Sequence, residues 1–396
     1  MTNSSFIWSD GWWVEDNIAW FVDGEHSILY RLDMNIGECK FIAQIPNEKE
    51  NCFRLNPRCI KIEKEIYCIP DVGDCIWVYH LEKAEFVQIE IGNINYARLG
   101  ITNFWLDKNK LYAVSRGLGQ IIEVDIHGKR VSKYYDLEDE VSQSVKVDDV
   151  ILCVSAVSGC VYEFNIVTKR RTKYVLPIQV CGMNTICFDG ENFWFSGKRK
   201  EIYVWNKEKN TLKVLNQFPK SFGIYCFDNN VEGVVDCDLQ QYEIPTFITS
   251  VFVGKQIWFI PFKTNKIIYV DKDTLKFNTL ELPEEEESEV SLAANRLKHK
   301  YLLQYILNNR YIGLYSLKNG QVFEIDTIDK TVSWKDCFIS DESIGSIVNA
   351  LVTNNQHFME GAGIDSLVYK KVIEKSYVDD RKMQENVGQM IYQKTK

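Results

Sequence analysis

The chain has 396 residues, of which 45% are hydrophobic and 26% charged, which is ample material for a buried core. Its 46 basic and 55 acidic residues give a formal net charge of −9, which argues against a broadly basic nucleic-acid binder. No apolar run approaches the roughly 18 residues of a membrane-spanning helix, and residues 1–10 lack the pattern of a secretory leader. We therefore predict a cytoplasmic protein that does not enter the membrane.

Twelve cysteines are spread through the chain without a single C-x-x-C pair, so the usual zinc-ribbon and thioredoxin spacings are absent from the sequence. Most of them, such as Cys68 and Cys153, lie inside apolar runs, where a free cysteine behaves as a small hydrophobic residue. We predict reduced, buried thiols, no metal site and no cofactor.

One phrase recurs seven times along the chain: an apolar run with an aromatic residue, a polar turn, and a second apolar run. Its first anchors are Trp20, Tyr67, Tyr112, Leu152, Trp194, Trp258 and Ile312. Its second anchors are Asp33, His80, Asp125, Asn165, Asn206, Asp271 and Asp326. The two anchors of each copy lie 12 to 14 residues apart, which indicates a genuine internal repeat.

Each copy has the composition of a β-hairpin, with strands rich in Val, Ile, Tyr, Phe and Trp around a polar turn. The predicted hairpins are residues 18–33, 66–80, 111–125, 151–165, 193–206, 257–271 and 311–326. The closing Asp or Asn predicts a further tight turn, because its short side chain can bond the backbone two residues on. His80 replaces this residue in one copy and is interpreted as a turn residue. Further short strands before and after each hairpin make four strands per unit.

Four-stranded units at this spacing resemble the β-propeller superfamily, in the manner of kelch, NHL or YVTN-type repeats. The resemblance covers about residues 5–340 and is one of strand pattern, so it implies a fold and no particular activity. It implies an all-β, seven-bladed β-propeller in residues 1–340, with six or eight blades as alternatives. An apparent extra hairpin within Lys220–Thr246 would make the eighth blade if it were independent.

Two ways of closing the ring are open. The segment Ser5–Trp8 adds an outermost strand to the last blade, or the run TVSWKDCFI completes blade 7 by itself. The acidic run that starts at Pro283 is predicted to be a solvated loop between blades 6 and 7. Residues 341–396 carry apolar residues at helical spacing and predict a short helical extension, which packs back on the propeller or mediates self-association.

A basic arc is predicted on one face of the ring, where the second-to-third turns and the interblade connections of a propeller lie. The candidate ligand-binding residues are Arg54, Arg58, Arg98, Arg116, Lys198, Arg199, Lys200, Lys263 and Lys318, with His26 beside them. Such an arc would focus positive potential on an anionic ligand; the alternative is that these are ordinary solvated turns. Trp12, Trp13 and Trp105 are interpreted as packing residues between blades, with a stacking platform as the alternative.

The sequence carries no recognisable catalytic motif, so we predict a non-catalytic binding or assembly module that uses the propeller mouth. Its expected partner is an acidic protein segment or another anionic ligand, and the sequence indicates no oligomeric state. The alternative is an enzyme or small-ligand binder acting on an anionic, carbohydrate-like substrate in the central funnel. Glu25, His26 and Asp74 are the acid–base candidates for that alternative.

Overall fold

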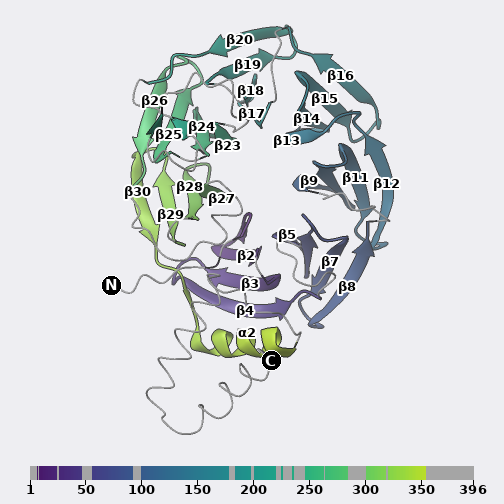
Figure 1. Cartoon of the computed structure of the whole chain (residues 1–396). Helices are drawn as coiled ribbons and strands as arrows, with labels where there is room; N and C mark the ends of the chain where they lie inside the picture. Colours follow the sequence, from purple (N-terminus) through teal and green to yellow (C-terminus); the bar gives the residue numbers. More distant parts are fainter. Residues whose placement is uncertain are drawn as a thin grey trace.

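In the computed structural model the described residues are 7, 9–24, 26–46, 56–91, 100–177, 183–197, 200–219, 224–225, 234–235, 246–262, 264–283, 300–317 and 320–353. Seven antiparallel sheets are arranged as blades around a central axis (Figure 1). The prediction of an all-β, seven-bladed propeller is therefore confirmed. In each blade the strands follow one another from the innermost to the outermost position.

The first four blades each contain four strands in sequence order. Blade 1 contains β1 (Trp13–Glu15), β2 (Ile18–Val22), β3 (Ile28–Asp33) and β4 (Glu38–Gln44). Blade 2 contains β5 (Arg58–Ile62), β6 (Glu65–Ile69), β7 (Cys75–His80) and β8 (Glu85–Glu90). Blade 3 contains β9 (Ile101–Asp107), β10 (Lys110–Ser115), β11 (Gln120–Asp125) and β12 (Arg130–Asp136). Blade 4 contains β13 (Val141–Val147), β14 (Val150–Ser155), β15 (Cys160–Asn165) and β16 (Arg171–Val175).

The last three blades repeat this order. Blade 5 contains β17 (Thr185–Phe188), β18 (Phe193–Ser196), β19 (Ile202–Asn206) and β20 (Thr211–Leu215). Blade 6 contains β23 (Phe247–Val253), β24 (Gln256–Pro261), β25 (Lys266–Asp271) and β26 (Phe277–Glu281). Blade 7 contains β27 (Tyr301–Leu307), β28 (Tyr311–Ser316), β29 (Val322–Asp326) and β30 (Thr331–Lys335). The second and third strands of every blade carry the repeated phrase.

The hydrophobic core lies between the blades. Tyr67 of blade 2 shares a buried cluster with Leu111 of blade 3, and Leu152 of blade 4 packs with Phe195 of blade 5. A four-stranded sheet has two faces, and stacking against both neighbours buries them. Trp12 is also a packing residue, because its ring stacks between Phe21 of blade 1 and Tyr305 of blade 7.

The turn between the third and fourth strands has the same form in every blade. In blade 6, Asp271 Oδ1 accepts hydrogen bonds from the backbone N–H groups of Asp273 and Thr274 at 3.2 and 2.9 Å. His80 takes this place in blade 2, where its Nδ1 accepts from Lys83 N at 3.4 Å, which confirms its prediction as a turn residue. Four residues after the anchor, φ is positive in all seven turns, at Gly37, Ala84, Lys129, Lys169, Asn210, Leu275 and Lys330.

The run TVSWKDCFI completes blade 7, as the second predicted route has it, but the end of this run pairs with blade 1. β30 completes blade 7, but the next residues form β31 (Phe338–Ile339), which pairs in parallel with the outer edge of β4. On the channel side, Trp12 N donates to Gln304 O of blade 7 at 2.7 Å. Of the predicted N-terminal strand, Ser5, Phe6 and Trp8 lie outside the described residues.

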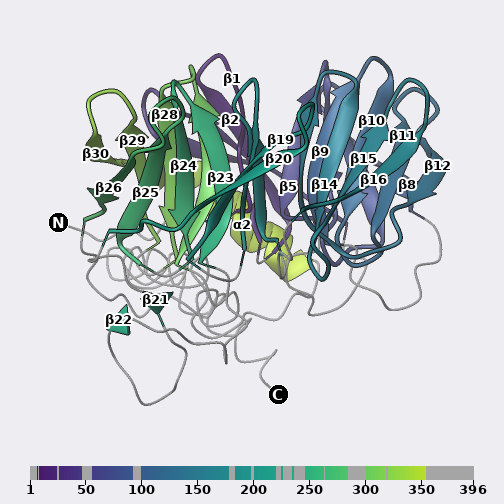
Figure 2. The same ribbon diagram turned by 90° about the horizontal axis from the view of Figure 1, so that it is seen from above.

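Two smaller elements complete the architecture. β21 (Ile224–Tyr225) and β22 (Val234–Val235) form an antiparallel pair to one side of the blades, so this insertion is an extra hairpin (Figure 2). Helix α2 (Asp341–Thr353) packs against β4. The acidic loop after Pro283 and residues 354–396 lie outside the described residues.

The eight described cysteines are free, and seven of them are buried. Burial raises the pKa of the Cys187 thiol to about 12. Within the part of the chain that the structure describes, no helix is long and apolar enough to cross a bilayer.

Candidate functional site

The second-to-third turns and the interblade connections lie on one face of the ring, which we call the mouth face. Backbone hydrogen bonds join the two sets: Gly100 N donates to Asp71 O at 2.9 Å, and Ala156 N donates to Glu140 O at 2.9 Å. The first-to-second and third-to-fourth turns lie on the opposite face, which we call the rear face. These two sets of turns are joined as well, for example by a bond from Ile126 N to Asn109 O at 3.1 Å.

Of the predicted basic arc, the structure describes Arg58, Arg116 and Lys200. The other predicted members, Arg54, Arg98, Lys198, Arg199, Lys263 and Lys318, lie outside the described residues. The arc as a whole therefore stays a prediction, and its three described residues differ in what they do.

Arg58 acts as a strut between blades 2 and 3. Its Nη1 donates to Ile101 O at 3.0 Å and to Thr102 O, both at the start of β9. Its Nε lies 3.8 Å from the Asp10 carboxylate, which offsets the charge. The innermost strand of a blade has no sheet partner on its channel side, so its carbonyl groups need other donors.

Arg116 and Lys200 lie in the mouth turns of blades 3 and 5. The Arg116 side chain is exposed, while its backbone is fixed by a bond from its N–H to Gly100 O at 3.0 Å. The Arg116 carbonyl also accepts from Val141 N at 3.4 Å. Asp71 lies close by, because a Cβ on Gly100 would be 3.3 Å from Arg116 Cβ and 3.7 Å from Asp71 Oδ1. The rim at this junction is therefore rigid and carries both signs of charge.

His26 lies in the mouth turn of blade 1 and is buried. Its turn is organised by the buried carboxylate of Asp23, which accepts from His26 N at 2.6 Å and from Ile28 N at 2.8 Å. Asp74, the second acid–base candidate, is exposed in the turn of blade 2, and Glu25 lies outside the described residues.

A belt of polar side chains joins the innermost strands across the blade junctions, and sequence reasoning missed it. Asn103 Nδ2 donates to Ser144 O of blade 4 at 2.6 Å, and Ser142 Oγ donates to Met183 O of blade 5 at 2.5 Å. Like Arg58, each side chain reaches a carbonyl group of a neighbouring inner strand. We call these residues, with Gln143, Asn184 and Gln304, the inner belt.

Gln143 spans the longest step of the inner belt, from blade 4 past blade 5 to blade 6. Its Nε2 donates to Ile248 O at 3.0 Å, while Asn184 of blade 5 donates to Phe247 O next to it. The signal in the sequence is a polar residue in or just before the first strand of a blade. It is weak, because the residue type differs from blade to blade.

The rear face carries a second set of interblade contacts, which we call the lysine staples: Lys129, Lys169, Lys207 and Lys330. Each comes from the third-to-fourth turn of one blade, and its Nζ lies 4.5 to 5.5 Å from the centre of an aromatic ring of the preceding blade. A lysine in this position gains from the negative face of the ring as well as from any nearby carboxylate.

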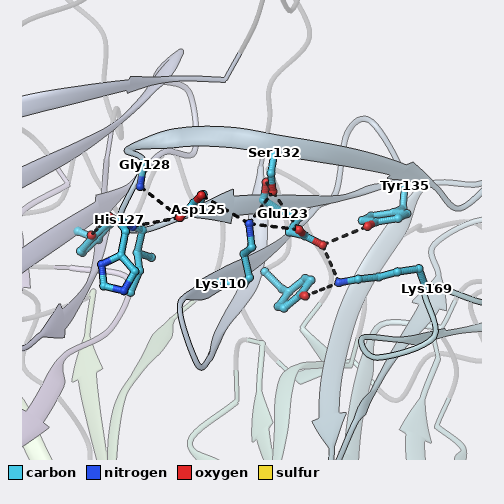
Figure 3. A network of polar contacts seen from close by, with 11 residues as sticks. Lys110, Glu123, Asp125, His127, Gly128, Ser132, Tyr135 and Lys169 are labelled. Atoms are coloured by element: carbon cyan, nitrogen blue, oxygen red, sulfur yellow. Dashed lines mark hydrogen bonds and ion pairs between the residues drawn. The ribbon is translucent and has the colours of Figure 1, made fainter.

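Lys169 illustrates the bonding of a lysine staple (Figure 3). Its Nζ donates to Glu123 Oε2 at 2.7 Å and to Tyr112 OH at 2.5 Å, both in blade 3. Glu123 also accepts from Tyr135 OH at 3.0 Å and from Ser132 Oγ at 2.9 Å. Burial alone would raise the pKa of Glu123, but the bonds from Lys169, Ser132 and Tyr135 outweigh it and lower that pKa. Burial and the neighbouring Glu123 raise the pKa of Tyr135 to about 12.

No group of three or more His, Cys, Asp and Glu side chains that could hold a metal ion occurs among the described residues. The side chains of the inner belt bond to backbone carbonyl groups and the lysine staples bond to side chains of the preceding blade, so both sets hold blades together. On the mouth face, Arg116 combines an exposed charge with a fixed backbone.

No protein-family model matches the chain, and no curated protein is similar to it in sequence. Among solved structures, a streptogramin B lyase is similar to this chain, with a TM-score of 0.54, 13% identity, and coverage of 83% of this chain and 96% of that one. PorZ, an essential surface component of the type-IX secretion system of Porphyromonas gingivalis, is similar with a TM-score of 0.54 and 12% identity. That match covers 85% of this chain but 39% of PorZ. These similarities show the propeller fold.

Proposed function

We propose that the protein is a binding module whose mouth face takes an acidic protein segment. The observation that carries the proposal is Arg116, an exposed guanidinium on a backbone that is hydrogen-bonded to the neighbouring connection. The hydrogen-bonded backbone fixes the position of the turn that carries this charge, so less of the rim has to become ordered when an anion binds. Lys200 adds a second positive charge two blades further along the same face. The inner belt supports the proposal, because it makes the channel wall a rigid frame for the rim.

The test measures the binding of a fluorescent peptide of ten glutamates to the whole protein. Fluorescence anisotropy gives the affinity at two salt concentrations. Replacing both Arg116→Glu and Lys200→Glu should weaken binding roughly tenfold or more, because attraction becomes repulsion. The matched control, Lys83→Glu with Lys209→Glu, makes the same change in net charge on the rear face, where these side chains are 63% and 70% exposed. An equal loss of affinity in both variants would refute a site on the mouth face.

A second candidate is an enzyme or small-ligand binder acting on an anionic, carbohydrate-like substrate. Two observations favour it. The fold similarity to a lyase extends over 83% of this chain and 96% of that one, and His26 is buried on the mouth face. A sugar phosphate such as glucose 6-phosphate, used as the second probe in the same experiment, separates the two candidates. Binding of the sugar phosphate but not of the peptide, lost on His26→Ala, would select the second candidate.

A further inference from the structure

The junction between blades 7 and 1 is built differently from the other six. After each of blades 1 to 6 the chain continues to the innermost strand of the next blade, so those junctions are covalently continuous. Blades 7 and 1 are instead held by contacts alone, at an inner and an outer position. The inner contact consists of Ser9, Trp12 and Gln304: Ser9 Oγ donates to Gln304 Oε1 at 2.9 Å, and Gln304 Nε2 donates back to Ser9 O at 3.0 Å.

The outer contact is the segment that follows blade 7. Phe338 N donates to Gly37 O at 2.9 Å, and Ser340 N donates to Cys39 O at 3.3 Å, so the segment follows the edge of β4. The Ser343 hydroxyl then accepts from Phe41 N at 3.0 Å, where the first turn of α2 replaces the strand. We call residues 336–347 the outer segment.

Three isoleucines fix the outer segment to the core. Ile339, Ile344 and Ile347 are buried in one cluster with Leu32 of blade 1 and Tyr305 of blade 7. Part of the apolar core at this junction therefore comes from the segment that follows the outermost strand of blade 7.

Gly37 shows that the close approach of the outer segment requires a particular residue. Gly37 lies four residues after the anchor of its turn, in the left-handed conformation with a φ of 75°. The same position carries a staple lysine in blades 3, 4 and 7. A Cβ at Gly37 would overlap the Asp336 carbonyl oxygen and lie 3.6 Å from the Cys337 Cα. At this junction the passing backbone thus replaces the lysine staple, and a side chain at position 37 would displace it.

We propose that the outer segment is a latch, whose release lets blades 7 and 1 part at the perimeter while the rest of the ring stays folded. The inner contact of Ser9, Trp12 and Gln304 is the pivot, because it lies on the channel side and does not involve the latch. Release exposes the apolar surface between these two blades and leaves the covalently continuous junctions closed. This conformational device is independent of any ligand at the mouth face.

Hydrogen exchange read by mass spectrometry on the full chain tests the latch, with Gly37→Ala as the release variant. Two glycines at positive φ are matched controls for the backbone strain. A Cβ at Gly254 meets nothing within 4 Å, and a Cβ at Gly119 would overlap the Asp139 carbonyl at the covalently continuous junction of blades 3 and 4. We expect Gly37→Ala to speed exchange roughly tenfold or more in β4, β30 and the latch, and to leave β13–β20 unchanged. Neither control should change exchange in β4.

A milder variant, Ile347→Ala, keeps the experiment decisive if Gly37→Ala does not fold. It shortens one buried side chain of the latch and should give the same regional pattern with a smaller increase. The proposal fails if exchange rises equally in all seven blades, which would mean global destabilisation. It also fails if β4 exchanges no faster in Gly37→Ala than in Gly254→Ala.

Discussion

At the scale of single residues, the polar side chains of this protein mostly serve to join blades. Glu123 illustrates this, because Lys169, Ser132 and Tyr135 all donate to its carboxylate. A surface ion pair usually contributes little, but here the carboxylate is buried and one lysine also lies over the ring of Tyr112. The sequence does not reveal the lysine staples, because their partners lie about 40 to 75 residues away.

Glu123→Gln should lower the free energy of unfolding at pH 7 by about 2 kcal/mol. The pKa of Glu123 is lower in the folded protein than its ordinary value of 4.5. Its contribution is therefore present above pH 4.5 and is lost as the pH falls through the folded pKa. Urea unfolding at pH 7 and pH 3 should show a deficit for the variant that shrinks at the lower pH. Glu208→Gln, at an exposed turn of blade 5, is the control, and an unchanged deficit at pH 3 would refute the ion pair.

At the scale of elements, the turn between the third and fourth strands is the most regular feature of the molecule. The anchor side chain accepts backbone N–H groups, and this bonding holds the residue four positions later at positive φ, including Leu275 and Ala84, which have no intrinsic preference for it. The hairpins could be predicted because their anchors repeat at nearly constant spacing. The pairing of Phe338 with Glu38 could not, since nothing local in either segment indicates a partner 300 residues away.

Ala84→Gly should raise the free energy of unfolding by about 1 kcal/mol, because glycine removes the steric cost of the left-handed conformation at this exposed position. The adjacent exposed residue gives the control: Lys83→Gly should lower stability, because it only adds freedom to the unfolded chain. Chemical denaturation of both variants measures the difference. A loss of stability in Ala84→Gly would show that the turn carries no strain at this residue.

At the scale of the whole molecule, the ring is held by the interblade core, the inner belt, the lysine staples and the outer segment. The number of blades could be predicted from the repeat. The inner belt could not be predicted, because its donors, such as Arg58 and Asn103, differ in residue type. Their acceptors are backbone carbonyl groups, which every residue has. The predicted basic arc treated Arg58 as a ligand-binding residue. The structure shows that Arg58 also donates hydrogen bonds to carbonyl groups of blade 3 and so joins blades 2 and 3.

Gln143→Leu should lower the free energy of unfolding by about 1–2 kcal/mol, since it leaves Ile248 O without its donor at similar side-chain volume. Thermal and urea unfolding of the full chain measure it. Gln217→Leu, at an exposed position after β20, should remain within about 0.5 kcal/mol of the parent. An equally small change for Gln143→Leu would mean that the step from blade 4 to blade 6 contributes nothing to the ring.

The left-handed turn position has a further consequence. Because the anchor side chain sets the backbone, the same left-handed position carries different residue types, from Gly37 and Ala84 through Leu275 to the lysines of blades 3, 4 and 7. Two of these positions, Ala84 of blade 2 and Asn210 of blade 5, are exposed and belong neither to the outer segment's contact nor to the lysine staples. One side chain installed at both would be displayed from two blades at a fixed spacing, so that two weak contacts with one partner combine into avidity without a change of fold.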